Sequence, residues 1–487
     1  MKYFRFVTIT LIFTIILSMG FVRGQEKENL AGSRQFVEAV NLLEVWIESV
    51  LDFNRLPGVS IAIVHDQDIV YTRGFGYADV KNGIKATSDT YYSIASISKQ
   101  FTAIAIMQLR DKGKLHLDDP VSRYLSWFAP VPIETDSLQP TIRDLLRHTS
   151  GLPTEPDLTV WSDPNELFPG REEFIRRVKN IKLGYATNTQ FNYSNTGYAL
   201  LGEIISVVSK MDYADYVQQY ILEPMNLDHT TTNFQDKNFR SKAAKGYGRW
   251  PRKGTRVEIP GLDTKAMAPA EGFGSTVRDL ARFAMWQFRV LDGQYNDILK
   301  RETLKEMQSV QWENPKWGYG FTYWYLGDLD IIGHQGGAAG YKSQIILSPE
   351  EKIAVVVMFN AYDAPQWGIA MDTYDIIAQA IRKSNSKENE KKTSEREDYT
   401  GYYTADRSWA EAQVLKWDGA LSVMWLPVNS RPLPSLIQLR HIKDHVFRQV
   451  RKDGSLGKYY VFGTDENSNI STMKFNNNVI RKMNRCH

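Results

Sequence analysis

The stretch YSIASISKQFTAIAIM, residues 92–107, joins a β-rich run to a helix that is apolar on most of its sides. A helix of this kind is typical of the centre of a fold. Ser96 begins the helix, where backbone N–H groups have no partner within it. Lys99 follows three residues later, so both side chains lie on one helix face. A serine hydroxyl needs a base before it can act as a nucleophile. A lysine in a dry site can be that base, because burial lowers its pKa.

The segments around this helix predict an α+β fold. Apolar residues at helical spacing indicate a first helix, which Pro57-Gly58 ends. Two β-rich runs then indicate a hairpin. The expected order is a helix (33–51), a β-hairpin (59–75), a helix-rich middle (115–284), further β-rich runs (321–359) and a last helix (374–381). Helices packed on an antiparallel sheet, with a helical insertion, would give this order.

The region 33–382 is flanked by segments of a different character. Residues 1–24 have a basic start, an apolar run and small residues at the end, which is typical of a secretory signal peptide. We therefore expect export to a periplasm or the exterior, without stable membrane insertion after cleavage. The alternative is a retained anchor, because the run is almost long enough to span a bilayer. Residues 383–397 are almost wholly polar and predict a solvated linker. Residues 398–487 predict a small all-β domain.

Composition excludes several functions for the 487-residue chain. The formal net charge is only +3 and is spread along the sequence, so nothing demands nucleic acid as a partner. Cys486 is the only cysteine, which rules out an intrachain disulfide. The sequence contains no H-E-x-x-H motif or other cluster of metal ligands. We therefore expect neither a metal nor another cofactor.

Two further motifs give the Ser96 motif its meaning. The S-x-x-K pattern also occurs at Ser384, Ser455 and Ser471, but only Ser96 lies where a β-rich run meets a buried helix. Tyr193-Ser194-Asn195 is the only Y-x-N in the chain. His334-Gln335-Gly336 is the only H-x-G, and it ends a short β-rich run.

In this order, the three motifs resemble the signature of the family that contains class C serine β-lactamases, penicillin-binding proteins, D-Ala-D-Ala carboxypeptidases, D-aminopeptidases and esterases. The resemblance covers about residues 56–381 and includes four more strings: LDDPV (117–121), LLRHTSGL (145–152), GSTVRDLARF (274–283) and GHQGGAAGY (333–341). It implies a β-lactamase/transpeptidase-like fold, with an antiparallel sheet covered by helices on both faces and a helical subdomain. A small barrel-like domain often follows it.

The resemblance implies a role for each motif residue. Ser96 would attack an amide or ester carbonyl and form an acyl-enzyme. Lys99 and Tyr193 would share the proton transfers. Asn195 would hydrogen-bond Lys99 or a substrate amide, and His334 would lie over the cleft near Tyr193.

The same resemblance implies how the substrate is held. The backbone N–H of Gly337, with that of the nucleophile, would form the oxyanion hole. Gly336, Tyr341 and Glu271 would bind substrate. Glu271 stands where the family usually has a small residue; it either faces the cleft and alters the preference for charged substrates, or is a solvated loop acid. His148 resembles a base but is structural in the family's H-T-S-G-L string.

The third motif ranks the functions. Class C β-lactamases usually carry lysine where His334 stands, and a cation suits the carboxylate of a β-lactam. A histidine with its ordinary pKa near ~6.5 is mostly neutral at neutral pH. We therefore expect a peptidase or esterase rather than an efficient β-lactamase, with an ester, D-amino-acid amide, muropeptide or β-lactam as substrate. The alternative is a non-catalytic penicillin-binding sensor or a structural, oligomer-forming protein. The C-terminal domain would either serve in packing or oligomerisation, or close one side of the cleft and so limit the size of the substrate.

Overall fold

The computed structural model describes residues 30–133, 138–158, 166–294, 298–385, 398–405, 410–428 and 431–483. The expected signal peptide, residues 1–24, lies outside these ranges. Residues 386–397 of the expected linker also lie outside them. Within the described ranges, no helix combines the length and apolar character needed to cross a membrane. In the same part of the chain, no group of three or more His, Cys, Asp or Glu side chains is arranged to hold a metal ion.

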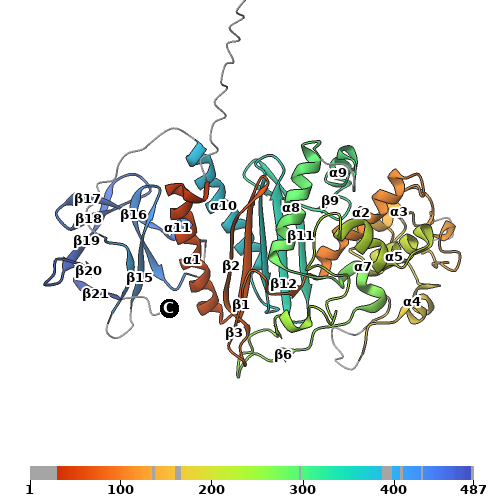
Figure 1. The fold of residues 1–487 in the computed structure, drawn as a ribbon, viewed down its shortest axis with the longest axis horizontal. Coiled ribbons are helices and arrows are strands. Elements are labelled where there is room, and N and C mark those ends of the chain that lie inside the picture. Colours follow the sequence, from red (N-terminus) through yellow and green to blue (C-terminus); the bar gives the residue numbers. More distant parts are fainter. Residues whose placement is uncertain are drawn as a thin grey trace, which may run out of the picture.

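A nine-stranded antiparallel sheet forms the centre of the molecule (Figure 1). Two of its inner strands, β1 and β13, are buried almost throughout, which explains their nearly continuous apolar sequence. The strand order is β3 (Ile84–Lys85), β2 (Asp68–Asp79), β1 (Gly58–His65), β13 (Ile353–Phe359), β12 (Tyr341–Ser348), β11 (Leu329–Ala338), β10 (Thr322–Leu326), β9 (Lys316–Trp317) and β8 (Trp312–Glu313).

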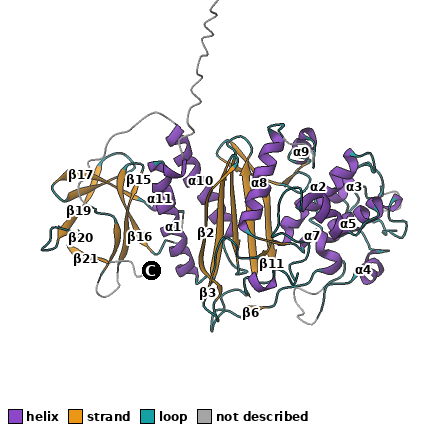
Figure 2. Cartoon of the chain, in the orientation of Figure 1, coloured by secondary structure: helices purple, strands orange, loops and turns teal. Residues whose placement is uncertain are grey.

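Helices cover both faces of the sheet (Figure 2). Successive residues of a strand point to opposite faces, so Val355 and Val357 of β13 pack in one core and Val356 in the other. The first core is shared with α1 (Arg34–Asn54) and α10 (Gln366–Asn385). The second is shared with α8 (Val277–Leu291) and the helical region beyond it. The expected α+β arrangement is confirmed.

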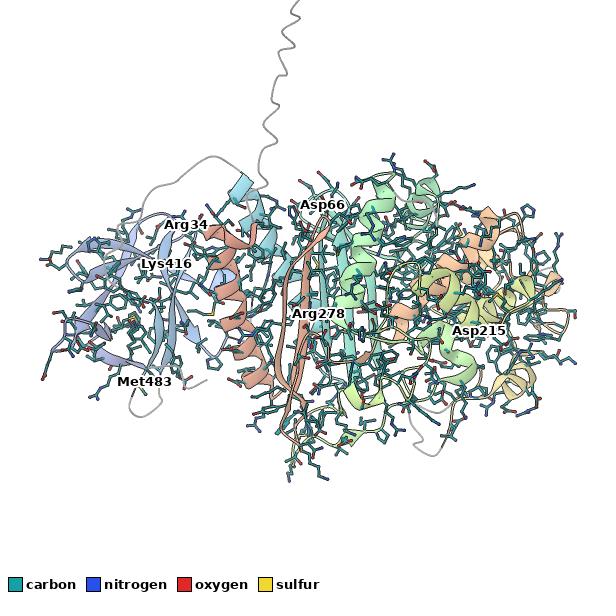
Figure 3. The ribbon with its side chains drawn as sticks, in the orientation of Figure 1. Arg34, Asp66, Asp215, Arg278, Lys416 and Met483 are labelled. Atoms are coloured by element: carbon teal, nitrogen blue, oxygen red, sulfur yellow. The ribbon has the colours of Figure 1, made fainter. Side chains whose placement is uncertain are left out.

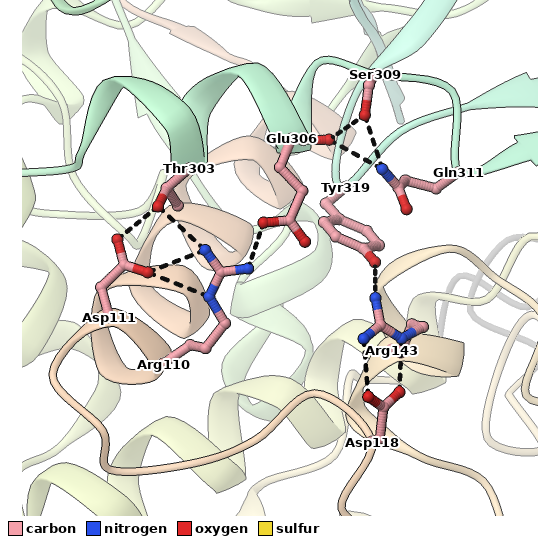
Figure 4. Close-up of polar contacts among 9 residues, drawn as sticks. All are labelled: Arg110, Asp111, Asp118, Arg143, Thr303, Glu306, Ser309, Gln311 and Tyr319. Carbon is pink, nitrogen blue, oxygen red and sulfur yellow. Dashed lines mark hydrogen bonds and ion pairs between the residues drawn. The ribbon is translucent and has the colours of Figure 1, made fainter.

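The central helix of the helical region is α2 (Ser98–Asp111), whose residues from Ser98 to Leu109 are all buried. It packs against α5 (Asn195–Ser209) and α7 (Ala268–Glu271). At its far end, Arg110 pairs with Glu306 of α9 (Arg301–Met307) at 2.5 Å (Figure 4). This ion pair and the surrounding hydrogen bonds hold the C-terminal end of α2 against α9.

A second polar contact in Figure 4 fixes the loop after β9. Arg143 on α3 (Ile142–Leu146) is held by both carboxylate oxygens of Asp118, at 2.6 and 2.9 Å, and donates to the hydroxyl of Tyr319. The aromatic segment 317–321 is thereby tied to the helical region. Trp317, at the start of that segment, is buried and reaches the site described below.

The C-terminal residues form a closed eight-stranded barrel with its own aromatic and aliphatic core. Its strands are β14 (Gly401–Thr404), β15 (Glu411–Trp417), β16 (Ala420–Leu426), β17 (Ile437–Lys443), β18 (Val446–Val450), β19 (Leu456–Thr464), β20 (Ile470–Phe475) and β21 (Asn478–Met483). This agrees with the small all-β domain expected from the sequence.

The barrel docks on α1 and α10, on the side of the sheet away from α2 (Figure 1). The Val428 N–H donates to Oγ of Ser49 at 2.6 Å, and Arg431 pairs with Asp372 at 2.6 Å. Arg34 and Lys416 mark this junction in Figure 3. The described part of the barrel therefore packs against the helices α1 and α10 and, within one chain, lies on the opposite side of the sheet from α2.

Three boundaries differ from the sequence expectations. Helix α10 reaches Asn385, three residues into the expected linker at 383–397. Strand β11 continues to Ala338, so His334 lies inside a strand rather than at its end. Ser96 lies in a 3-10 turn, Ala95–Ile97, and α2 itself starts at Ser98. Short polar patterns do not fix such ends, because neighbouring elements can extend a strand or helix past its apolar run.

Candidate active site

The turn that carries Ser96 is held in an unusual conformation. Ala95 has a φ of 43°, in the left-handed region that non-glycine residues rarely adopt. The hydroxyl of Ser98 donates to the Ala95 carbonyl at 2.5 Å and accepts the Phe273 N–H at 3.1 Å. These contacts tie the turn to the loop after α7. Backbone strain at one residue persists only where its surroundings impose it, and here it presents Ser96 half-buried at the start of α2.

Lys99 is completely buried, and its ammonium group meets three acceptors. Nζ lies 3.2 Å from Oγ of Ser96, 2.7 Å from Oδ1 of Asn195 and 2.9 Å from the carbonyl oxygen of Ala270. It also lies 4.7 Å from the centre of the Tyr193 ring. The structure thus brings together the first two motifs from α2 and α5.

Burial controls the charge of this lysine. Removal from water disfavours the cation and lowers the pKa of Lys99 to about 7, although the carboxylates of Glu271 and Glu155 act in the opposite direction. Burial likewise raises the pKa of Glu271, with Glu155 adding to the rise and Lys99 opposing it. Near neutral pH, a large share of Lys99 is therefore available as a base.

Tyr193 lies beside the Ser96 hydroxyl, close enough for Ser96 to act on the pKa of the phenol. Burial raises the pKa of Tyr193 well above its ordinary value, although Ser96 lowers it in part. The phenol therefore stays protonated at neutral pH. It can pass a proton along, but it cannot serve as the initial base. Ser96 accordingly lies beside one group that can accept its proton and one that can relay it.

His148 lies behind Tyr193 as a packing residue. Its ring centroid is 4.4 Å from that of Tyr193, and its Nδ1 accepts the Ser194 N–H at 3.0 Å. Burial lowers the pKa of His148 well below its ordinary value, so the ring is neutral. Trp317 closes the cluster, with its ring 5.7 Å from that of Tyr193. His148 thus supports the tyrosine, as the structural interpretation of the H-T-S-G-L string expects.

The third motif lies on the open edge of β11. Strand β10 pairs with β11 only as far as Gly333, so the following residues have β12 as their only paired neighbour among the described strands. A Cβ on Gly336 would come within 2.1 Å of the Ile94 carbonyl oxygen. Gly336 is therefore the point at which β11 contacts the Ser96 turn. Because glycine has no side chain, the strand can approach the turn this closely. The neighbouring Gly337 is exposed.

His334 is a neutral acceptor in this structure. It is 2% exposed, and Nδ1 lies 2.6 Å from the Gln335 carbonyl, which requires the proton to be on Nδ1. Nε2 is buried and has no partner among the described residues. Burial and the neighbouring Lys99 lower the pKa of His334 to about 3. The expectation of an ordinary histidine pKa is wrong, because this ring is removed from water beside a lysine.

Tyr341 and Glu271 line one small cavity, which Ala338 also borders. The Tyr341 hydroxyl donates to the Ala244 carbonyl at 2.8 Å. Glu271 is only 3% exposed. Of the two interpretations of Glu271, the solvated loop acid is therefore wrong.

Glu155 is a site residue that the sequence analysis missed. Its Oε1 accepts from Nδ2 of Asn195 at 2.6 Å, which leaves the Asn195 amide oxygen facing Lys99. No motif includes Glu155, and it lies forty residues before its partner. Only the fold brings it there.

The sequence pattern of the Beta-lactamase family matches residues 44–379, which contain every residue described in this site. The chain belongs to the β-lactamase family. Protein flp of Staphylococcus aureus strain MW2 is 31% identical over 326 residues, which cover 65% of this chain and 62% of flp. A protein of Escherichia coli O157:H7 named "Putative D-alanyl-D-alanine carboxypeptidase" is 28% identical over 375 residues, covering 68% of this chain and 84% of that protein. This β-lactamase-family chain thus spans about three fifths of the length of flp.

Solved structures extend the similarity to the barrel. An octameric penicillin-binding protein homologue from Pyrococcus abyssi superposes with a TM-score of 0.62 and 26% identity, over 91% of this chain and all of that one. The protein SurE superposes with a TM-score of 0.57 at 19% identity over 92% of this chain, which shows likeness of fold alone. The β-lactamase/transpeptidase-like fold with a C-terminal barrel is therefore established.

Proposed function

We propose that this β-lactamase-family protein is an exported serine hydrolase that cleaves amide or ester bonds through an acyl-enzyme on Ser96. One observation carries the proposal: the Ser96 hydroxyl lies 3.2 Å from a lysine with a lowered pKa, beside a protonated tyrosine. A nucleophile with a base and a proton relay beside it is what acyl transfer requires.

The reaction follows from these contacts. Neutral Lys99 takes the Ser96 proton as Oγ bonds to the carbonyl carbon, and the carbonyl electron pair moves to oxygen. The backbone N–H groups of Ser96 and Gly337 would stabilise that oxyanion. The intermediate then collapses, the C–N or C–O bond breaks, and the proton passes from Lys99 through Tyr193 to the leaving group. Water then attacks the carbonyl carbon of the acyl-enzyme while Lys99 accepts its proton. The bond from that carbon to Oγ of Ser96 breaks, and Ser96 regains a proton.

His334 supports a peptidase or esterase rather than an efficient β-lactamase. A neutral ring whose free nitrogen accepts hydrogen bonds gives no charge attraction to a substrate carboxylate. The name of the Escherichia coli relative points to peptide-like substrates as well. Export is proposed from the pattern of residues 1–24, and sequencing the N-terminus of the protein recovered outside the cytoplasm would test it.

Intact-mass analysis tests the chemistry. The protein is exposed to a fluorophosphonate and to a panel of esters, D-amino-acid amides and β-lactams. We expect one adduct per chain with the fluorophosphonate, none in Ser96→Ala, and a normal adduct in Ser384→Ala, which alters another S-x-x-K serine. Stoichiometric labelling of Ser96→Ala would refute the proposal. An acyl adduct that never turns over would instead favour the non-catalytic sensor.

A further inference from the structure

The loop between β5 (Gly246–Tyr247) and β6 (Glu258–Ile259) is strongly basic. Its residues 248–256 read GRWPRKGTR, which contains four cationic side chains and no acid. Arg256, the last of them, pairs with Asp363 at 2.5 Å. It also donates to the carbonyl at the start of the loop at 2.7 Å. Arg256 therefore anchors the loop, and the other three cations have a different role.

Those three cations, Arg249, Arg252 and Lys253, are exposed to solvent. No ion pair among the described residues engages them. Lys342 of β12 lies beside them. Its Nζ is 4.6 Å from the centre of the Tyr362 ring, and burial together with the nearby Arg249 lowers the pKa of Lys342. The loop and the start of β12 thus form one cationic region.

The turn between β2 and β3 extends this region. The Tyr247 hydroxyl accepts the Val80 N–H at 3.0 Å, which ties the turn to β5. The turn carries Lys81, and β3 carries Lys85, whose Nζ lies 4.0 Å from the centre of the Tyr77 ring. Strands β3 and β6 accordingly lie at the same end of the central sheet (Figure 1). We call these six cations the basic surface: Lys81, Lys85, Arg249, Arg252, Lys253 and Lys342.

The acids Glu258, Asp363 and Asp79 border the basic surface, and each is already engaged. Glu258 pairs with Lys245 at 3.6 Å, and Asp363 pairs with Arg256. Asp79 is buried and accepts two hydrogen bonds within its own turn. The basic surface therefore keeps an excess of positive charge, although the formal net charge of the whole chain is only +3.

Exposed apolar side chains lie among these cations. Val80, Ile84 and Val257 are at least half exposed, and Tyr77 and Tyr362 are more than a third exposed. A soluble polyanion would be held by charge alone and would leave these side chains in water. At a bilayer surface they enter the boundary between headgroups and acyl chains, while lysine and arginine reach the lipid phosphates. The pattern therefore favours an anionic lipid surface over a free polyanion.

We propose that the basic surface and the apolar side chains within it dock the protein on a bilayer that contains anionic lipids. The docked surface adjoins the cleft. A Cβ on Gly337 would lie 2.9 Å from Nζ of Lys342, and the Tyr247 N–H donates to the Gly340 carbonyl at 3.3 Å. Docking would thus hold the open edge of β11 next to the headgroups. The binding goes beyond the proposed hydrolysis and does not depend on it.

Co-sedimentation with vesicles tests the proposal, with the protein as it is recovered after export. One set of vesicles is phosphatidylcholine alone, and the other contains equal parts of phosphatidylglycerol and phosphatidylcholine. We expect binding to the second set to be much stronger. It should weaken as salt is added, because exposed charges are screened. Equal binding to both sets, or binding that salt does not weaken, would overturn the inference.

Two charge-matched variants locate the contact. The first removes three cations of the loop: Arg249→Gln, Arg252→Gln and Lys253→Gln. The second removes three exposed cations of the barrel: Arg440→Gln, Lys443→Gln and Lys452→Gln. Each cation close to an anionic bilayer typically strengthens binding about fivefold, so the first variant should bind about 100-fold more weakly and the second like the wild type. If the two variants bind equally well, the loop is not the contact and the inference is wrong.

Val257→Ser distinguishes a lipid surface from a free polyanion. It should weaken binding to the anionic vesicles severalfold and leave binding to soluble polyphosphate unchanged. Polyphosphate binding as tight as vesicle binding, with no effect of Val257→Ser on either, would assign the surface to a polyanion and overturn the inference. Ser96→Ala should bind vesicles like the wild type, so failure to bind lipid and failure of Ser96 to react are distinct results.

Discussion

Nζ of Lys99 lies 2.7 Å from Oδ1 of Asn195, and Asn195 is itself oriented by Glu155. The lysine is therefore held toward Ser96 by an amide whose own direction is fixed. Because burial lowers the pKa of Lys99 to about 7, its neutral form becomes more abundant as pH rises through that value. Acylation needs the neutral form, which sets the sign of the pH dependence.

We expect the rate of Ser96 phosphonylation by an uncharged fluorophosphonate to rise about tenfold per pH unit below pH 7 and to level off above it. Lys99→Met should lose labelling by several orders of magnitude. Lys112→Met, at the exposed C-terminal end of the same helix, should label like the wild type. A flat profile, or a rate that falls as pH rises from 5 to 8, would contradict the role of Lys99.

Substitutions of His148 distinguish a packing role, in which it positions Tyr193, from a direct role in proton transfer. Asparagine at this position retains an acceptor for the Ser194 N–H, whereas leucine does not. We expect His148→Leu to lower kcat by about 10- to 100-fold through displacement of Tyr193, and His148→Asn to restore part of that loss. The shape of the pH profile should stay as in the wild type in both variants. If the two variants lose activity equally and the profile changes, His148 takes part in proton transfer.

Much of this site could be predicted because local sequence determines it. The spacing of Ser96 and Lys99 acts through a 3-10 turn that runs directly into α2, and the pattern around Gly336 acts through one strand. Glu155 could not be predicted, since it reaches the site through a loop whose path depends on distant packing. The charge states could not be predicted either. An ordinary pKa for His334 assumes water around the ring, and the fold removes it.

The barrel shares a hydrophobic core with α1 and α10, because Leu415, Met424 and Val428 pack in the cluster that those helices form. We therefore expect cleavage between Asn385 and Asp398 to leave the two fragments associated on size-exclusion chromatography, with Ser96 labelling retained. Leu415→Asp, which buries a charge at this contact, should release the barrel fragment after cleavage. Tyr459→Asp, on an exposed position of the barrel, is the matched control. Immediate separation of the wild-type fragments would contradict the shared core.

His334 tests the preference among substrates. Since its pKa is lowered to about 3, the ring stays neutral from pH 5 to 8, and its protonation should leave the ratio of kcat/KM for an anionic and a matched neutral substrate unchanged over that range. His334→Lys places a cation beside the open edge of β11, where a charge-assisted hydrogen bond to a carboxylate is worth about 1.5–3 kcal/mol. The ratio should then shift toward the anionic substrate by about tenfold or more. Gln335→Lys, at the exposed neighbouring position, controls for a general gain of positive charge and should shift it far less. If His334→Lys remains folded by thermal melting and the ratio does not move, this side chain does not face the substrate carboxylate, and the ranking of peptidase or esterase over β-lactamase loses its physical basis.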